Sequence, residues 1–245
     1  MAAAALAVSL ASSQATPVYS QNVVGYATLP TPNPGTYYLL EVPFVEGVSN
    51  GANEVFGTDG ATSGLGLPDG TLIETWDFTH QTFVTAVYDT TVGSNPTGWY
   101  LYDDTTPGPI PVITPGQGYF VSPAAPVTHT FVGTVAVNIG ASKNLNLTSP
   151  GAYYLVGAVI PFAGPVDSAS GVNLTGLPDG SLVETWDTTH QTYVTAVYDT
   201  TVGSNPANWY LYDDTTPGPD PSIIVGQGFF VSPAAPYVWS ETLTP

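Results

Sequence analysis

The residues of this chain most able to carry chemistry are acids that occur twice. The stretch AVYDTTVGSNPTGWYLYDDTTPGP begins at Ala86 and returns with two changes at Ala196. The repeated acids are Asp69, Glu74, Asp77, Asp89, Asp103 and Asp104, with the copies Asp179, Glu184, Asp187, Asp199, Asp213 and Asp214. Two carboxyl groups can hydrolyse a glycosidic bond when one is protonated and the other ionised at a defined separation. Most of these aspartates stand in LPDG, YDTT or YDDTTPG, where Asp forms turns, so the sequence favours a turn role.

Adjacent aspartates form the one candidate metal site in the sequence. Asp103–Asp104 and the copies Asp213–Asp214 are each followed by two threonines. Carboxylates, hydroxyls and loop carbonyls are the hard oxygen ligands that Ca²⁺ accepts. No EF-hand spacing accompanies them, so calcium is a candidate cofactor on the oxygen ligands alone.

Nucleophilic catalysis has little support in the sequence. The chain has no cysteine and therefore no thiol nucleophile. His80 and His190 stand in the repeated THQT stretch, His129 lies between the repeats, and none has zinc-ligand spacing. We expect a protein that is not an enzyme.

Aromatic residues suggest a binding face. In GWYLY and NWYLY, strand alternation places Trp99 and Leu101 on one face and the neighbouring tyrosines on the other. Tryptophan is the default core residue. The candidate carbohydrate or contact face is therefore formed by Tyr100, Tyr102, Tyr210 and Tyr212.

The charge balance excludes two classes of partner. The chain contains one basic residue, Lys143, against 19 acids, for a formal net charge of −18. One cation cannot neutralise nucleic-acid phosphates or attract an anionic membrane. Without salt-bridge partners, the acids must be solvated, protonated, bound to cations or balanced by a partner. This composition suits a protein outside the cell.

A tandem duplication organises the chain. Residues 66–109 and 176–219 differ at six positions, and GQGYFVSPAAP at Gly116 is answered by GQGFFVSPAAP at Gly226. The segments TLIETWD and TFVTAVYD alternate and flank a four-residue connection, which predicts a hairpin. We expect an all-β fold of two tandem β-sandwich or partly open barrel domains, at residues 20–131 and 132–245.

The chain ends suggest self-association. The segment VTHTFVGTVAVNIG is predicted to run as one strand from the first repeat into the second, whereas the two chain ends carry separate β-prone segments. Strand addition between the ends of neighbouring molecules would imitate this joint and give an open, head-to-tail fibre. The candidate interface residues are Val23, Val24, Tyr26, Tyr237, Val238, Trp239 and Leu243.

Residues 1–19 form an apolar stretch rich in small residues, as in a secretory signal, but the basic residues that usually come before the apolar core of a signal are missing. The alternative is that these residues form an N-terminal arm. The motifs QNVVGY, TWD…Q…Y and GQGFFVSPA resemble a family of secreted, β-rich proteins of Verrucomicrobia–Planctomycetes type. This resemblance implies export to the cell surface or beyond and no activity. Together these features predict a secreted structural protein that assembles with itself into a filament, sheath or matrix. The alternative is a secreted carbohydrate-binding or adhesion module that binds polysaccharide through duplicated sites.

Overall fold

The structure is a computed structural model that describes residues 23–46, 49–56, 66–90, 98–103, 106–169, 171–200, 209–212 and 216–243. The predicted signal or arm at 1–19 lies outside these residues. We call the strands β1 to β7 half 1 and the strands β8 to β16 half 2. Half 1 contains β1 (Val24–Thr31), β2 (Tyr38–Glu41), the helical turn α1 (Ala52–Val55), β3 (Thr71–Asp77), β4 (Thr82–Tyr88), β5 (Trp99–Leu101), β6 (Gly118–Ser122) and β7 (Val127–Thr134). Half 2 contains β8 (Ser142–Leu147), β9 (Tyr154–Val156), β10 (Gly164–Pro165), β11 (Ser181–Asp187), β12 (Thr192–Tyr198), β13 (Trp209–Leu211), β14 (Ser222–Ile223), β15 (Phe229–Ser232) and β16 (Tyr237–Thr242). Within the described ranges, no helix has the length and apolar character that a membrane crossing requires.

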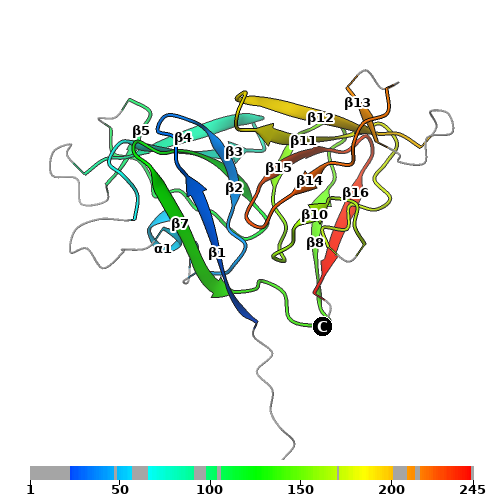
Figure 1. Cartoon of the computed structure of the whole chain (residues 1–245), viewed down its shortest axis with the longest axis horizontal. Helices are drawn as coiled ribbons and strands as arrows, with labels where there is room; N and C mark the ends of the chain where they lie inside the picture. The colour runs from blue at the N-terminus through cyan, green and yellow to red at the C-terminus, as the bar shows by residue number, and fades with distance from the viewer. Residues whose placement is uncertain are drawn as a thin grey trace, which may run out of the picture.

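The two halves share one strand order. Half 1 has a five-stranded antiparallel sheet ordered β2-β6-β3-β4-β5, and half 2 has one ordered β9-β15-β11-β12-β13. A two-stranded layer, β1-β7 or β8-β16, covers one face of each five-stranded sheet (Figure 1). Apolar side chains from both layers fill the space between them, among them Ile73 and Phe131 in half 1 and Val183 and Trp239 in half 2. The all-β sandwich prediction is confirmed.

Strand alternation gives each five-stranded sheet two different faces. Ile73 of β3 is buried in the core, while its neighbours Glu74 and Trp76 are only partly buried on the opposite face. Successive side chains of a strand point to opposite faces. The predicted hairpin is confirmed: β3 and β4 pair so that Trp76 lies opposite Phe83 and Glu74 opposite Thr85. We call this second face, turned away from the β1-β7 or β8-β16 layer, the outer face.

The joint between the halves differs from the predicted continuous strand. β7 ends at Thr134, and β8 begins only at Ser142. All eight residues of β7 pair with β1 of the same half, and β8 pairs with β16. The predicted boundary between residues 131 and 132 thus falls inside β7, and the structure divides the halves after Thr134.

Pairing within each half also affects the predicted end-to-end interface. Trp239 is 1% exposed in the core of half 2, and its indole nitrogen donates a hydrogen bond to the carbonyl of Val172. The Tyr237 hydroxyl donates to the Thr175 carbonyl. Main-chain hydrogen bonds hold Val23 and Leu243 to the 135–140 connection. Both end strands thus have a partner strand in their own chain, and strand addition between neighbouring molecules stays a prediction. Val24, Tyr26 and Val238, in contrast, are exposed.

The halves dock through reciprocal contacts. The indole nitrogen of Trp76 donates a 2.9 Å hydrogen bond to the carbonyl of Tyr153, and the equivalent Trp186 donates a 2.8 Å hydrogen bond to the carbonyl of Tyr37. A contact made in both directions by equivalent residues is the signature of two-fold symmetry. An approximate two-fold axis therefore relates the halves. The docking between the halves is therefore isologous rather than head-to-tail.

A glutamine in each hairpin turn completes the docking. Gln81 accepts a 2.8 Å hydrogen bond from the amide N–H of Tyr153, and Gln191 accepts a 2.9 Å hydrogen bond from the amide N–H of Tyr37. Both glutamines have φ of 52°, a left-handed conformation uncommon for a residue with a side chain. In Figure 1 the two hairpins, β3–β4 and β11–β12, extend from opposite sides toward the middle of the molecule. Their turns therefore hold the two halves together.

We expect the two indole hydrogen bonds to contribute equally to stability. Substitutions W76F and W186F keep an aromatic ring and remove one of two donors to a carbonyl, because Nε2 of Gln81 or Gln191 also donates to it, at 3.3 or 3.1 Å. Each is expected to lower the free energy of unfolding by about 0.5–1.5 kcal/mol, the net contribution of one hydrogen bond. Urea unfolding followed by far-UV circular dichroism measures this change, and H80A, in the exposed part of the same turn, is the control. A reciprocal interface would be contradicted if the two variants lost different amounts of unfolding free energy. It would also be contradicted if the protein unfolded in two separate transitions and each variant shifted only one of them.

Candidate functional site at the two-fold axis

Six aromatic rings surround the two-fold axis on the outer faces of the sheets. Trp76 and Phe83 of half 1 pack on Phe230 of half 2, with ring centroids 5.2 and 6.2 Å apart. Trp186 and Tyr193 of half 2 pack on Phe120 of half 1 in the same way, at 5.0 and 6.3 Å. The neighbouring rings are at 69–82° to one another, the edge-to-face arrangement that aromatic pairs prefer. We call this set the aromatic ring cluster: Trp76, Phe83, Phe120, Trp186, Tyr193 and Phe230.

An open groove lies on this cluster. Its volume is about 210 Å³, and its lining consists of Trp76, Phe83, Tyr153, Glu184, Tyr193 and Phe230. Both halves contribute walls. Tyr193 is 38% exposed, while Phe230 is buried beneath it. The groove is therefore an apolar, aromatic surface that solvent reaches.

Two glutamates flank the cluster in equivalent positions. Glu184 accepts a 3.0 Å hydrogen bond from the Thr195 hydroxyl and another from the hydroxyl of Tyr153. Glu74 accepts the same pair of bonds from Thr85 and Tyr37. Burial raises the pKa of both carboxyl groups. Burial and then the charges of Glu184 and Glu74 raise the pKa of Tyr193 to about 12, so the field of both acids reaches this ring.

The equivalence of the two glutamates bears on whether they could act as a catalytic acid and base. General acid–base catalysis by two carboxyl groups needs environments that push their pKa values apart. Glu74 and Glu184 have the same partners, and their pKa values are raised by the same causes. This arrangement suits hydrogen bonding to a bound molecule better than proton transfer.

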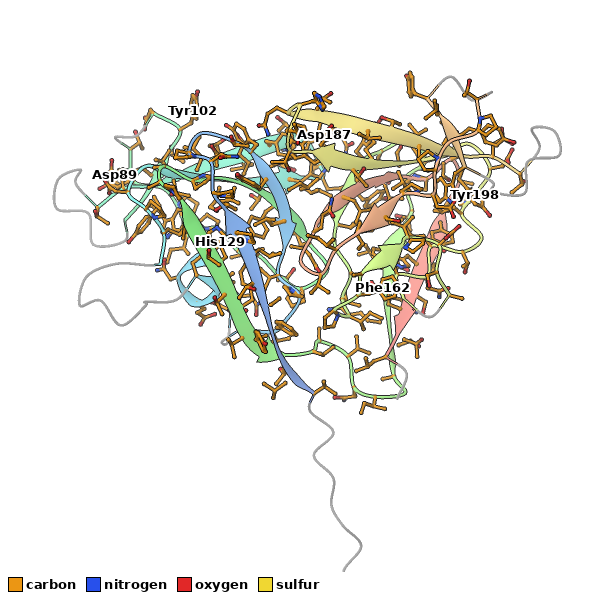
Figure 2. All side chains as sticks on the ribbon, viewed as in Figure 1. Asp89, Tyr102, His129, Phe162, Asp187 and Tyr198 are labelled. Atoms are coloured by element: carbon orange, nitrogen blue, oxygen red, sulfur yellow. The ribbon has the colours of Figure 1, made fainter. Side chains whose placement is uncertain are left out.

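The structure separates the four tyrosines of the predicted contact face. Tyr100 and Tyr210 are each 1% exposed, so their assignment to a contact face is wrong. The chain that returns after each edge strand pairs beside it, through a bridge of Tyr100 to Pro107 and of Tyr210 to Pro217. Tyr102 and Tyr212 are 74% exposed, and Figure 2 shows Tyr102 at the rim of half 1. Burial raises the pKa of Tyr37 and of Tyr153, followed by the charge of Glu74 or Glu184, and Tyr102 or Tyr212 adds a smaller contribution in the same direction. These two exposed tyrosines thus lie near the outer tyrosines of the site.

Some of the repeated aspartates form turns, as the sequence favours: Asp77 and Asp187 each accept hydrogen bonds from the amides two and three residues further on. Asp69 instead accepts hydrogen bonds from the amide and hydroxyl of Thr90, 21 residues away, and Asp179 does the same with Thr200. Asp103 likewise accepts from the amide and hydroxyl of Thr106, at 2.8 and 2.5 Å. Asp104, Asp213 and Asp214 lie outside the described residues. The calcium site at these aspartates stays a prediction.

The three histidines have two different roles. His80 and His190 are exposed in the hairpin turns, where Nδ1 lies 2.6 Å from the carboxylate of Asp77 or Asp187. Asp187 is labelled at the top of Figure 2. His129 is instead a core residue, 4% exposed, with its Nε2 3.2 Å from the Thr31 hydroxyl. Burial lowers the pKa of His129 to about 4, so this histidine is neutral near pH 7.

Sequence reasoning missed the aromatic ring cluster. It assigned Trp76 and Trp186 to the core by default and singled out neither Phe120 nor Phe230. The available signal was the repeated TWD…Q pattern, in which Trp alternates with core residues and therefore faces away from the core. The comparisons gave no match to any protein family, curated protein or solved structure.

Three further carboxyl groups are buried away from the groove. Burial raises the pKa of Glu46 and of Glu241 to about 8, and the pKa of Glu41 is raised well above its usual range by burial and then by neighbouring Glu241. Each has one carboxyl oxygen without a hydrogen-bond partner. A buried carboxylate without a cation is costly, so these groups are protonated near neutral pH.

These groups predict a protein that is more stable in weak acid. Between about pH 4.5 and 8 the unfolded chain releases protons that the folded Glu46 and Glu241 retain. Their stabilising contribution is complete below pH 4.5 and is lost as the pH rises towards 8. His129 acts in the opposite sense: its contribution is complete above about 6.5 and is lost as the pH falls towards 4. We therefore expect the melting temperature to rise as the pH is lowered from 8.5 to about 5.

Thermal unfolding across this pH range tests the expectation. Variants E46Q and E241Q should flatten the profile, because an amide does not ionise. E54Q, on α1, is the matched control and should leave the profile unchanged. A melting temperature that is constant or rises towards pH 8.5 in the wild-type protein would show that the buried acids do not control stability.

Proposed function

We propose that this chain is a secreted, non-catalytic carbohydrate-binding protein that holds a neutral glycan in the groove at its two-fold axis. The observation that carries the proposal is the combination of aromatic walls and one half-buried carboxyl group, that of Glu184, in one open groove. Binding sites are typically apolar surfaces with a few convergent polar groups of perturbed pKa. The C–H faces of a sugar ring stack on aromatic rings, and its hydroxyl groups donate to carboxylates.

The rigidity of the site supports this proposal. Trp76 is held by its hydrogen bond to the opposite half, and its neighbours hold it edge-to-face. The hydroxyl of Thr195 orients Glu184. A ligand therefore does not have to order these side chains, and pre-organisation of this kind reduces the entropic cost of binding.

The charge of the chain narrows the class of glycan. A net charge of −18 repels polyanions at low salt. Uncharged polysaccharides do not meet this barrier, so neutral glucans, xylans and mannans are the candidates, with alginate and pectin as anionic comparisons.

Affinity electrophoresis in gels containing each polysaccharide tests the proposed function. A neutral glycan is expected to retard the protein, and calorimetry with its oligosaccharides then gives the affinity. Y193A removes a groove wall and E184Q removes a carboxylate; each should weaken binding about tenfold, which corresponds to about 1.4 kcal/mol. Y26A, on an exposed tyrosine of β1, is the control. Wild-type protein that no glycan retards, or a Y193A variant with unchanged affinity, would refute the proposal.

A second candidate is the structural role, assembly into a filament, sheath or matrix. It is favoured by an exposed apolar patch on the outer surface of the β1-β7 layer. Val24, Tyr26 and Val132 are 66%, 76% and 59% exposed, and Tyr26 lies opposite Val132 in the strand register. Exposed apolar patches commonly mark contact surfaces. This route needs side-chain packing between molecules rather than strand exchange.

Light scattering at increasing concentration, with electron microscopy, tests the second candidate. Assembly through this patch predicts ordered polymers that the double variant Y26K/V132K dissolves. V84K, on the exposed apolar side chain of β4, is the comparison variant and should still assemble. A wild-type protein that stays monomeric at high concentration would remove this candidate.

A further inference from the structure

A second cavity lies between the halves, apart from the groove. Its volume is about 320 Å³, and Trp76 is the one residue that lines both. Half 1 contributes Phe78 and the 114–117 turn, and half 2 contributes residues of β8, β9 and β16. Its walls are mainly apolar and include Tyr154, on which Phe78 stacks with ring centroids 4.4 Å apart.

One buried polar group lines this cavity with unused hydrogen-bonding capacity. Glu241 is 2% exposed, and its Oε1 accepts a 3.0 Å hydrogen bond from the amide of Val159. Its Oε2 has no partner. Because buried polar atoms are nearly always paired in proteins, an unpaired oxygen in a cavity wall indicates a group that a bound molecule satisfies.

The only cation of the chain lines the same cavity. Lys143 is exposed on β8 and lies directly opposite Glu241 in the β8–β16 register. Residues opposite one another across a strand pair face the same side. Within the described residues, no carboxylate lies within ion-pair distance of Lys143.

We propose that this cavity binds a small amphipathic carboxylate, with its apolar body between Trp76 and Tyr154 and its carboxylate between Lys143 and Glu241. Lys143 supplies a positive charge. The Glu241 hydroxyl donates a hydrogen bond from Oε2, since Oε1 is already an acceptor. A hydrogen bond from a hydroxyl to an ionised oxygen is short and strong.

The charges around Glu241 are consistent with this assignment. Lys143 on β8 lowers the pKa of Glu241, but burial has the larger effect and raises that pKa to about 8. Glu41 on β2 interacts electrostatically with Glu241, and the pKa of Glu41 is raised as well. Tyr154 is the remaining titratable residue that lines the cavity. The carboxyl group thus keeps its proton near pH 7. An ammonium ligand would have to ionise Glu241 and would be repelled by Lys143, whereas a carboxylate leaves the proton on Glu241 and is attracted by Lys143.

Calorimetry with two matched probes tests the site. We expect 3-phenylpropionate to bind at pH 6–7.5 and 2-phenylethylammonium, with the same apolar body and the opposite charge, not to bind. Affinity for the carboxylate should fall above pH 8, as Glu241 ionises. K143Q should weaken binding three- to tenfold, and N146A, on the outward side of β8, should leave it unchanged.

The variant E241Q distinguishes the proposal from a site for cations. Its amide N–H can donate in place of the hydroxyl, so binding of the carboxylate should persist and lose its dependence on pH near 8. Preferred binding of the ammonium probe, loss of carboxylate binding in E241Q with the fold intact, unchanged affinity in K143Q, or binding of neither probe to the wild-type protein would each overturn the proposal. None of these measurements involves the glycan groove, so the two proposals can fail separately.

Discussion

The arrangement of this molecule depends on one interface, the edge-to-face packing of six aromatic rings about an approximate two-fold axis. The indole groups of Trp76 and Trp186 each donate a hydrogen bond across the axis while their rings pack on a phenylalanine of the opposite half. The interface thereby joins apolar burial with a directional contact. It fixes the angle between two sandwiches that only the short 135–141 connection links along the chain. Without this interface, neither the groove nor the cavity beside it would have both of its walls.

Where the two halves differ, the differences are adapted to this packing. Glu41 of β2 corresponds in sequence to Gly157 after β9, and the two positions face each other across the interface. A Cβ atom on Gly157 would lie 2.4 Å from the Cβ of Glu41, so glycine is required there once glutamate occupies the other half. Repeated sequence therefore produces the symmetric docking, and a few unequal positions produce the buried acids and the cavity found on one side.

The scarcity of cations has a structural counterpart. With one lysine, the chain cannot neutralise buried carboxylates by ion pairs, and it keeps Glu41, Glu46 and Glu241 protonated instead. Among the other acids that the structure describes, several accept hydrogen bonds from backbone amides and threonine hydroxyls, as at Asp69 and Asp103. The protein thus accommodates its acids by hydrogen bonding and protonation rather than by charge pairing.

The sequence by itself determined the local structure: all-β strands from alternation, the β3–β4 and β11–β12 hairpins, the turn aspartates and the duplication. These features depend on neighbours within a few residues, and periodicity and turn chemistry report such neighbours directly. Only the tertiary structure decided how the copies meet. The interface joins residues far apart in the chain, such as Gln81 with Tyr153 and Gln191 with Tyr37, and nothing in a single sequence ranks such pairings. The burial of Tyr100 was likewise settled by tertiary packing, which strand alternation alone could not show.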